Sequence, residues 1–305
     1  MNLIQIAWRN FCHRALSSIL TTLSLSLGVG LVVLVLSVYG VISEAFTRNA
    51  SVGYNLVVGP KGSPLQLTLN SVFYLSQPIE NLPYTEYLEF LSKEKRTELV
   101  DRFRGDESLK ERGGRYAPFI GDGYAIPLAL GDYFGEFRVV GTTPLFFEKL
   151  RHGPTLEQEF TFSIGRAFKE FSEEHSYFEA VVGSRVAKEM NVGIGDEFFP
   201  THGDPTGHGH DLGFTIVGVM DPTGTPNDRA AFVNLEGFYL MDGHAKPLEE
   251  SDTTEESEQS EAVESADVSD RVAKPDDYRL LSIAEREVTS LLVRTENIIF
   301  APSMQ

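Results

Sequence analysis

Apolar residues dominate one long stretch near the start of the chain. Between Arg14 and Glu44 lie 29 residues without a charge, including "ILTTLSLSLGVGLVVLVLSVYGVI". About 20 apolar residues are enough for a helix to cross a bilayer, so this pattern predicts a transmembrane helix within residues 15–43. Its Ser and Thr hydroxyls can bond back to the helix backbone. A cleaved signal peptide would have an apolar region of only about 7–15 residues and a small-residue cleavage site, which "VYGVISEAF" does not offer.

Before this helix, apolar residues recur at three- and four-residue spacing in "NLIQIAWRNFCHRAL". The spacing predicts an amphipathic segment at residues 1–14 that lies on the cytoplasmic face of the membrane. An extended start of the transmembrane helix is the alternative. Because Arg9, His13 and Arg14 flank the apolar run, the N-terminus is expected in the cytoplasm and residues 44–305 outside.

After residue 44 the pattern changes to short β-branched runs separated by glycine-containing turns. Extended structure is predicted at residues 52–83, and a helix from Thr85 to about Phe103. A second helix is predicted with Ser184 as its N-cap, closed by Asn191 and Gly193. Strands are predicted at "YAIPLAL", "FRVVGTT", "AVV", "FTIVGVM" and "SLLVRT". The fold class is therefore α+β, with one membrane helix followed by a mixed α/β domain outside the membrane.

Residues 247–277 differ from everything around them. Ten acidic residues and no basic residue lie between Glu249 and Asp270, with almost no large apolar side chain. Such a segment cannot bury enough surface to offset its ordering entropy, so it is predicted to be a disordered insertion in the outer domain. A role as an interaction tail or a cation-binding segment is the alternative.

The charge of the chain narrows the range of partners. There are 26 basic and 44 acidic residues, which gives a net charge of −18. This balance argues against nucleic acid as a partner, because phosphates require basic patches. The only cysteine is Cys12, on the predicted cytoplasmic side, so the outer domain is expected to fold without disulfides.

Two loops carry residue types that are used in chemistry. The first is "TGTPNDRAAFVNLEGFY", residues 223–239, where Asp228 and Arg229 follow turn residues. No nucleophile accompanies this pair, so a structural turn is favoured over catalysis. The second is "THGDPTGHGHDLG", in which histidines and carboxylates suit zinc or a similar ion. The predicted metal ligands are His202, Asp204, His208 and His210. A solvated glycine-rich loop is the alternative, and no other cofactor is expected.

The ordered set of motifs resembles a known family. "AWRNFCHRALSSILTTLSLSLGV" precedes "FRVVGTT", "VVGSRVAKEMNVGIGDEF", "FTIVGVMDPTGTPNDRAAFVNLEGF" and "LLVRT". Together they are similar to permease subunits of ABC transporters of the MacB/FtsX/LolC type, and to their extracytoplasmic core domain. The resemblance implies a MacB-like core fold at residues 44–305, and a bacterial inner membrane location.

The resemblance also implies a mechanism and partners. Two permeases would pair as a homodimer with cytoplasmic ABC ATPase subunits, and ATP hydrolysis would move the outer domains for export or extraction of a substrate. The permease itself would not be an enzyme. Such permeases have four membrane helices, whereas this sequence contains a suitable apolar run only once, so it is read as a permease subunit or the N-terminal part of one. A single-pass binding or scaffold domain is the first alternative, and a zinc-dependent enzyme is the second.

Overall fold

The structure is a computed structural model that describes residues 2–50, 53–153, 156–203, 209–241, 274–275 and 278–296. The chain forms two compact units, Met1–Ala50 and Ser51–Gln305. Nearly all of the acidic segment 247–277 lies outside the described residues, so its disorder stays a prediction.

The first unit consists of two helices, α1 (Leu3–His13) and α2 (Ala15–Ala50), separated by a turn at Arg14. The stretch Ala15–Val41 is the one described segment that is long and apolar enough to cross a membrane. At about 1.5 Å per residue it is about 40 Å long, which exceeds the hydrocarbon core of about 30 Å. The Thr21 hydroxyl donates to the carbonyl of Ser17 at 2.9 Å, as expected for a hydroxyl in such a helix.

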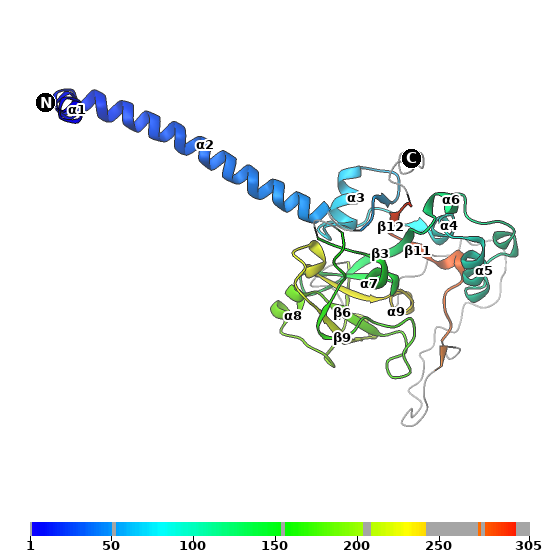
Figure 1. Ribbon diagram of the computed structural model, residues 1–305. Helices are drawn as coiled ribbons and strands as arrows, with labels where there is room; N and C mark the ends of the chain where they lie inside the picture. The colour runs from blue at the N-terminus through cyan, green and yellow to red at the C-terminus, as the bar shows by residue number, and fades with distance from the viewer. Residues whose placement is uncertain are drawn as a thin grey trace. The chain divides into compact units, whose positions relative to one another are not determined.

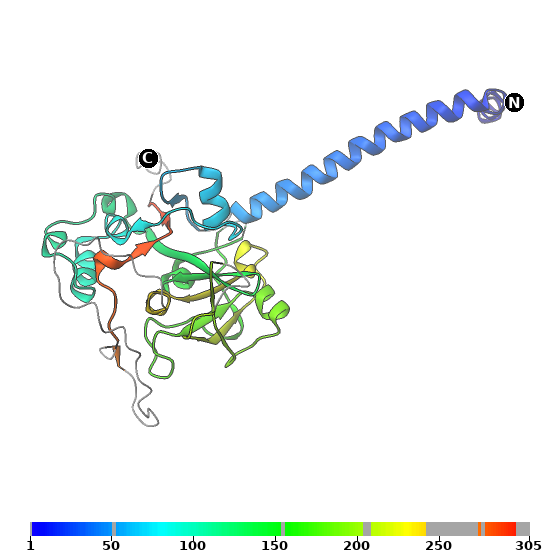
Figure 2. The ribbon, with the colours of Figure 1, turned by 180° about the vertical axis from the view of Figure 1, so that it is seen from behind.

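A large mixed β-sheet forms the centre of the second unit (Figures 1 and 2). Its strands follow the order β1-β12-β3-β4-β10-β6-β9-β5, and the pairs β4–β10 and β6–β9 are parallel. The strand bounds are β1 Leu56–Val58, β3 Tyr124–Phe134, β4 Phe137–Thr142, β5 Phe162–Gly165, β6 Glu179–Val182, β9 Phe214–Met220, β10 Ala230–Asn234 and β12 Ser290–Arg294.

Three short strand pairings complete the sheets. Strand β7 (Glu197–Phe198) pairs with β9, and β8 (Thr201–His202) pairs with β3. A separate two-stranded sheet joins β2 (Leu82–Pro83) to β11 (Glu287–Val288).

Both faces of the large sheet are buried. On β10, Ala231 and Val233 belong to one apolar cluster, whereas Ala230 and Phe232 belong to the other. Side chains alternate between the two faces of a strand, so a strand covered on both faces reads as a continuous apolar run. This is why the sequence locates β4, β6, β9 and β12 well.

Helices cover these faces. The helices are α3 Pro64–Ser71, α4 Tyr84–Leu88, α5 Lys93–Arg102, α6 Ala117–Ile120, α7 Leu145–Lys149, α8 Ser184–Met190 and α9 Leu235–Leu240. Among the described residues, 3₁₀ turns lie at Glu107–Lys110, Pro226–Arg229 and Ile283–Glu285. Helices α4, α5 and α6 gather beside β11 (Figures 1 and 2). The predicted α+β class is therefore confirmed.

Three local predictions were wrong. Part of the segment predicted as extended, 52–83, is helix α3, which begins with Pro64 at its first position. Proline is favoured there because its fixed φ suits the helix and the first turn needs no N–H from it.

Ser184 is the first residue of α8 rather than its cap. The cap is Gly183, while Asn191 closes the helix in the left-handed conformation as predicted.

The helix predicted from Thr85 to Phe103 is two helices, α4 and α5. The chain breaks at Glu89, whose carbonyl accepts a hydrogen bond from the Tyr116 N–H at 2.8 Å instead of continuing a helix. A new helix then begins after Ser92, whose hydroxyl accepts from the Lys95 N–H. A contact with a residue distant in sequence therefore overrides the local helical pattern.

Candidate functional site

The loop at residues 223–229 is held by its own hydrogen bonds. The carboxylate of Asp228 accepts from the N–H and hydroxyl of Thr223 and from the Gly224 N–H, each at 2.8 Å. The Thr225 hydroxyl caps the 3₁₀ turn by accepting from the Asn227 N–H. Asp228 thus satisfies the backbone of the turn.

The same loop is also anchored to neighbouring elements. The Tyr74 hydroxyl donates to the Asn227 side chain at 2.9 Å inside the protein. Gly183 lies so close to the loop that a Cβ there would sit 2.5 Å from the carbonyl oxygens of Asn227 and Asp228. The guanidinium of Arg229 lies over the ring of Phe137, 5.7 Å from its centre. These polar groups of the loop therefore have structural roles, which agrees with the predicted turn.

The structure brings together part of the predicted histidine site. His202 and His210 both contact the carboxylate of Asp132, which the sequence did not indicate as a ligand. The other two predicted ligands, Asp204 and His208, lie outside the described residues. A hydrophobic strand with one carboxylate, "LALGDYF", carries no metal-binding spacing, so only the three-dimensional structure identifies Asp132.

A cleft of about 770 Å³ lies between the helices α4–α6 and the sheet. Rings and aliphatic side chains such as Tyr87, Phe90, Leu99 and Phe168 form part of its walls. Charged residues line the rest, and both signs are present: Lys95, Glu98, Arg102, Asp122, Glu148, Lys149, Lys169, Glu170 and Glu236. Ligand sites commonly have this volume and this combination of apolar walls with a few polar groups.

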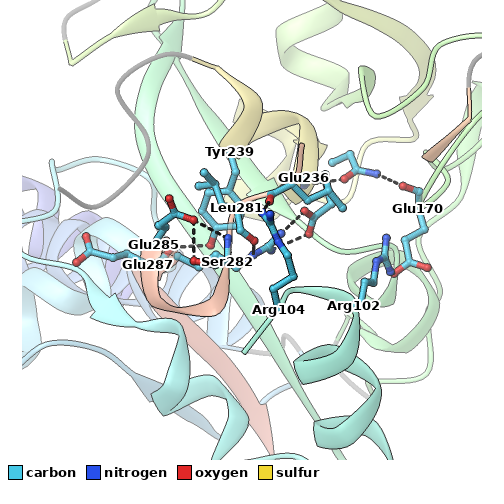
Figure 3. Close-up of polar contacts among 12 residues, drawn as sticks. Arg102, Arg104, Glu170, Glu236, Tyr239, Leu281, Ser282, Glu285 and Glu287 are labelled. Carbon is cyan, nitrogen blue, oxygen red and sulfur yellow. Dashed lines mark hydrogen bonds and ion pairs between the residues drawn. The ribbon is translucent and has the colours of Figure 1, made fainter. Parts of the chain in front are cut away.

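Two segments are joined across this cleft by polar contacts. Arg102 on α5 pairs with Glu170 at 2.8 Å. The Asn234 side-chain amide donates to the carbonyls of Lys169 and Glu170, each at 2.8 Å. Figure 3 shows Arg102 and Glu170 side by side. The segment 168–170 is thus fixed between α5 and the end of β10.

Beneath the cleft lies a buried ion pair, Arg286 with Glu236. The two guanidinium nitrogens donate to the two carboxylate oxygens at 2.9 and 2.5 Å, and the arginine side chain is completely buried. The Arg286 guanidinium also lies 3.5 Å from the centre of the Phe103 ring. Burial alone would lower the pKa of Arg286, but the charge and hydrogen bonds of Glu236 raise it above its usual value, so the guanidinium stays charged.

This pair fastens the segment before β11 to α9. Figure 3 shows Glu236 and Tyr239 of α9 next to Leu281, Ser282 and Glu285. The Tyr239 hydroxyl donates to the carbonyl of Glu287 at 2.5 Å. The Glu285 carboxylate accepts from the Ser282 N–H at 2.7 Å and forms a capping box. Sequence reasoning missed this connection, because Glu236 and Arg286 are 50 residues apart and no local pattern links them.

The ionisable groups that line the cleft are carboxylates, lysines, an arginine and tyrosines. None of the described residues that line it is a histidine or a cysteine. Burial raises the pKa of Tyr84 well above its usual value, so its phenol stays neutral. The charges Arg102 and Glu170 are paired, as are Glu236 and Arg286.

Comparison with known proteins identifies the family. A family model described as the MacB-like periplasmic core domain matches residues 18–273. The chain belongs to this family. The resemblance to permeases of the MacB type is thereby confirmed, and so is the MacB-like character of the outer domain. MacB-like domains of this kind occur in permease components of ABC transporters, which are not themselves enzymes.

One solved structure among those similar to this MacB-like chain is the extracellular domain of the noncanonic ABC-type transporter YknZ from Gram-positive bacteria. Its sequence is 9% identical, the alignment covers 59% of this chain and 68% of that chain, and the TM-score is 0.28. No curated protein matches the chain.

Proposed function

We propose that this chain is a permease subunit, or the N-terminal part of one, of a bacterial ABC transporter. A cytoplasmic ATPase hydrolyses ATP, and the energy moves the extracytoplasmic domain to export or extract a substrate. The observation that carries the proposal is the family match over residues 18–273, which runs from the apolar helix into the sheet domain. A permease has to join these two parts in one chain.

The proposed arrangement places the N-terminus in the cytoplasm and residues 44–305 on the outer side of the inner membrane. The uncharged helix and its flank of Arg9 and Arg14 support this orientation. The segment 1–14 lies along the cytoplasmic surface of the bilayer, near the ATPase. Two copies of the chain form the working unit.

The chemistry of the described residues supports a transport role over an enzymatic one. The loop at 223–229 satisfies its own backbone, and the charges of Arg102 and Glu170 are paired across the cleft. A transporter domain needs a surface that binds and a fold that transmits force. The buried connection between Arg286 and Glu236 joins the segments around the cleft into one body that can move as a unit.

The first test is capture of the ATPase. A tagged chain is purified from its native membranes in mild detergent, and the proteins that accompany it are identified by mass spectrometry. An ABC ATPase is expected among them. Its absence would favour the single-pass binding or scaffold domain instead.

The second test measures movement. Lys188 is exposed on α8, so a spin label on Lys188→Cys in a Cys12→Ser background reports the distance between two copies. With the captured ATPase, ATP and vanadate should change the distance distribution. An ATPase variant that cannot hydrolyse or trap nucleotide is the matched control. Identical distributions with and without nucleotide would contradict ATP-driven movement.

A further inference from the structure

A buried carboxylate and two histidines meet at the end of β3 opposite β8. Asp132 is completely buried and lies directly opposite His202 in the antiparallel register. Its two carboxylate oxygens each face one imidazole: Oδ1 is 3.2 Å from His202 Nδ1, and Oδ2 is 3.1 Å from His210 Nε2. The two rings are perpendicular, and their centres are 5.8 Å apart.

We propose that Asp132, His202 and His210 bind a divalent transition-metal ion of the zinc class. One ligand atom from each residue lies within 4.8 Å of the other two. Around tetrahedral zinc with bonds of about 2.0–2.1 Å, neighbouring ligand atoms are roughly 3.3 Å apart. Each imidazole nitrogen lies at about this spacing from one of the two carboxylate oxygens, His202 from Oδ1 and His210 from Oδ2.

Little movement is needed to complete the geometry. The two imidazole nitrogens have to converge on one position beside the carboxylate, and the His202 side chain is 60% exposed, so it has room to rotate. The His210 side chain is 7% exposed and is held in place by its backbone N–H, which donates to the Pro200 carbonyl at 2.9 Å. The site is therefore largely preformed. The buried side chains of Asp132 and His210 are fixed by their surroundings, and the exposed His202 side chain can adjust.

The donor set selects the class of ion. Two imidazole nitrogens and one carboxylate oxygen suit zinc and other borderline divalent metals, whereas calcium and magnesium prefer oxygen ligands alone. Three protein ligands leave a fourth position for water or another ligand, on the side where His202 is exposed.

The electrostatics of the site are compatible with a cation. The Asp132 carboxylate is completely buried, and each of its oxygens lies beside an imidazole. The Arg138 guanidinium is also close enough to interact with its charge. A divalent ion between the carboxylate and the imidazoles would add positive charge next to this buried carboxylate.

A metal at this site would attach the connection between β7 and β9 to strand β3 of the sheet. Other contacts in the described part of this region include a bridge between Thr201 and Gly209 and a hydrogen bond from the Gly203 N–H to the Gly131 carbonyl at 3.2 Å. Gln77 also donates to the carbonyl of Gly203. The metal site goes beyond the permease role, since it concerns what holds this part of the outer domain in place.

The test uses the full chain in detergent micelles or nanodiscs. After chelator treatment and desalting, Zn²⁺ is titrated against a chromophoric chelator, and Co²⁺ is added to a second sample as a spectroscopic probe. One zinc ion per chain should bind tightly enough to compete with the chelator. Co²⁺ should give the intense visible bands of a tetrahedral site.

His202→Ala and His210→Ala should each weaken zinc binding by roughly 100-fold or more, because losing even a residue that only orients a ligand costs about 10–100-fold. Each of these two substitutions should also abolish the visible Co²⁺ bands of the tetrahedral site. His175→Ala is the matched control, since His175 lies elsewhere in the fold beside Glu174, and it should change neither readout.

Asp132→Asn removes the buried carboxylate. If the Asp132→Asn variant does not fold, His202→Ala still tests the site, because the His202 side chain is exposed and its replacement should not disturb the fold. Weak binding to the acidic residues at 249–270 would persist equally in every variant. If the wild-type chain does not compete for zinc, or if His202→Ala and His210→Ala bind as tightly as the wild type, the three residues form only a hydrogen-bonded network and the proposal is wrong.

Discussion

Removing the charge of Glu236 is the sharpest test of what holds the outer domain together. In Glu236→Gln, the completely buried guanidinium of Arg286 loses its negative partner and one of the two oxygens that accept its hydrogen bonds, because a carboxamide has a single oxygen. Breaking a buried ion pair by removing one partner costs about 3–5 kcal/mol, since the remaining charge is left uncompensated. The remaining contacts of Arg286 offset part of this cost. They are its bond to the Leu281 carbonyl at 2.9 Å and the Phe103 ring at 3.5 Å.

The free energy of unfolding should therefore fall by about 3 kcal/mol, towards the lower end of that range. A domain of this size loses about 2–4 °C in Tm for each kcal/mol, so a fall of roughly 6–12 °C is expected. The measurement is thermal unfolding of the full chain in detergent, followed by near-ultraviolet circular dichroism, with urea titration as a second route.

Two further variants separate the ion pair from other effects. The double substitution Glu236→Leu with Arg286→Met should recover most of the loss, because apolar residues of similar volume often replace a buried pair with little cost. Arg102→Gln is the matched control: its pair with Glu170 is exposed, with the two side chains 28% and 64% accessible. Exposed pairs contribute about 0–1 kcal/mol. If Glu236→Gln costs no more than Arg102→Gln, the reasoning about the buried pair fails.

Three other predictions follow from single observations. Lys61→Cys in a Cys12→Ser background should react with an impermeant maleimide in intact cells, whereas wild-type Cys12 should react only after permeabilisation; the reverse result would invert the proposed topology. Burial would raise the pKa of Glu89, but hydrogen bonds from Arg112, from the Arg115 N–H and from Arg96 lower it to about 2. Because the pKa of Glu89 is lower in the folded than in the unfolded state, its ionised form stabilises the protein above the unfolded value of 4.5, and this stabilisation is lost as the pH falls towards 2. Glu89→Gln should therefore make Tm fall less steeply with pH between 4.5 and 2 than in the wild type. An equally steep fall of Tm in the variant would refute this. Asp228→Ala removes three hydrogen bonds at 2.8 Å and should lower the free energy of unfolding by about 2 kcal/mol in urea titration; a change below about 0.5 kcal/mol would show that the turn does not depend on it.

Several central strands were predictable because the pattern that identifies each one lies within its own segment of sequence. Strands β4, β9 and β12 are buried on both faces, so each appears as a short continuous run of β-branched and aliphatic residues bounded by glycine or polar residues. The long apolar helix was equally clear, since a soluble fold seldom contains a helical run of that length without a charge.

The errors fell where distant contacts decide the local structure. Leu65, Leu67 and Leu69 alternate like a strand, yet they lie in helix α3, where Leu67 packs onto Gly59 and Leu65 is 66% exposed. The break at Glu89 depends on Tyr116, which is 27 residues further along the chain. Neither contact leaves a signature in the neighbouring sequence.

The cluster at Asp132 shows the same limit in the functional chemistry. The histidines were found because three of them fall within nine residues, whereas Asp132 is 70 residues earlier in an apolar strand. Its position opposite His202 comes from the β3–β8 register and from the irregularity in β3 between Leu130 and Tyr133. A slip of one residue in an antiparallel pair turns each side chain to the other face, so it would remove the carboxylate from both imidazoles. Zinc affinity would therefore report on the register of this strand pair, and a one-residue deletion at the irregularity in β3 should abolish binding even though all three ligands remain in the chain.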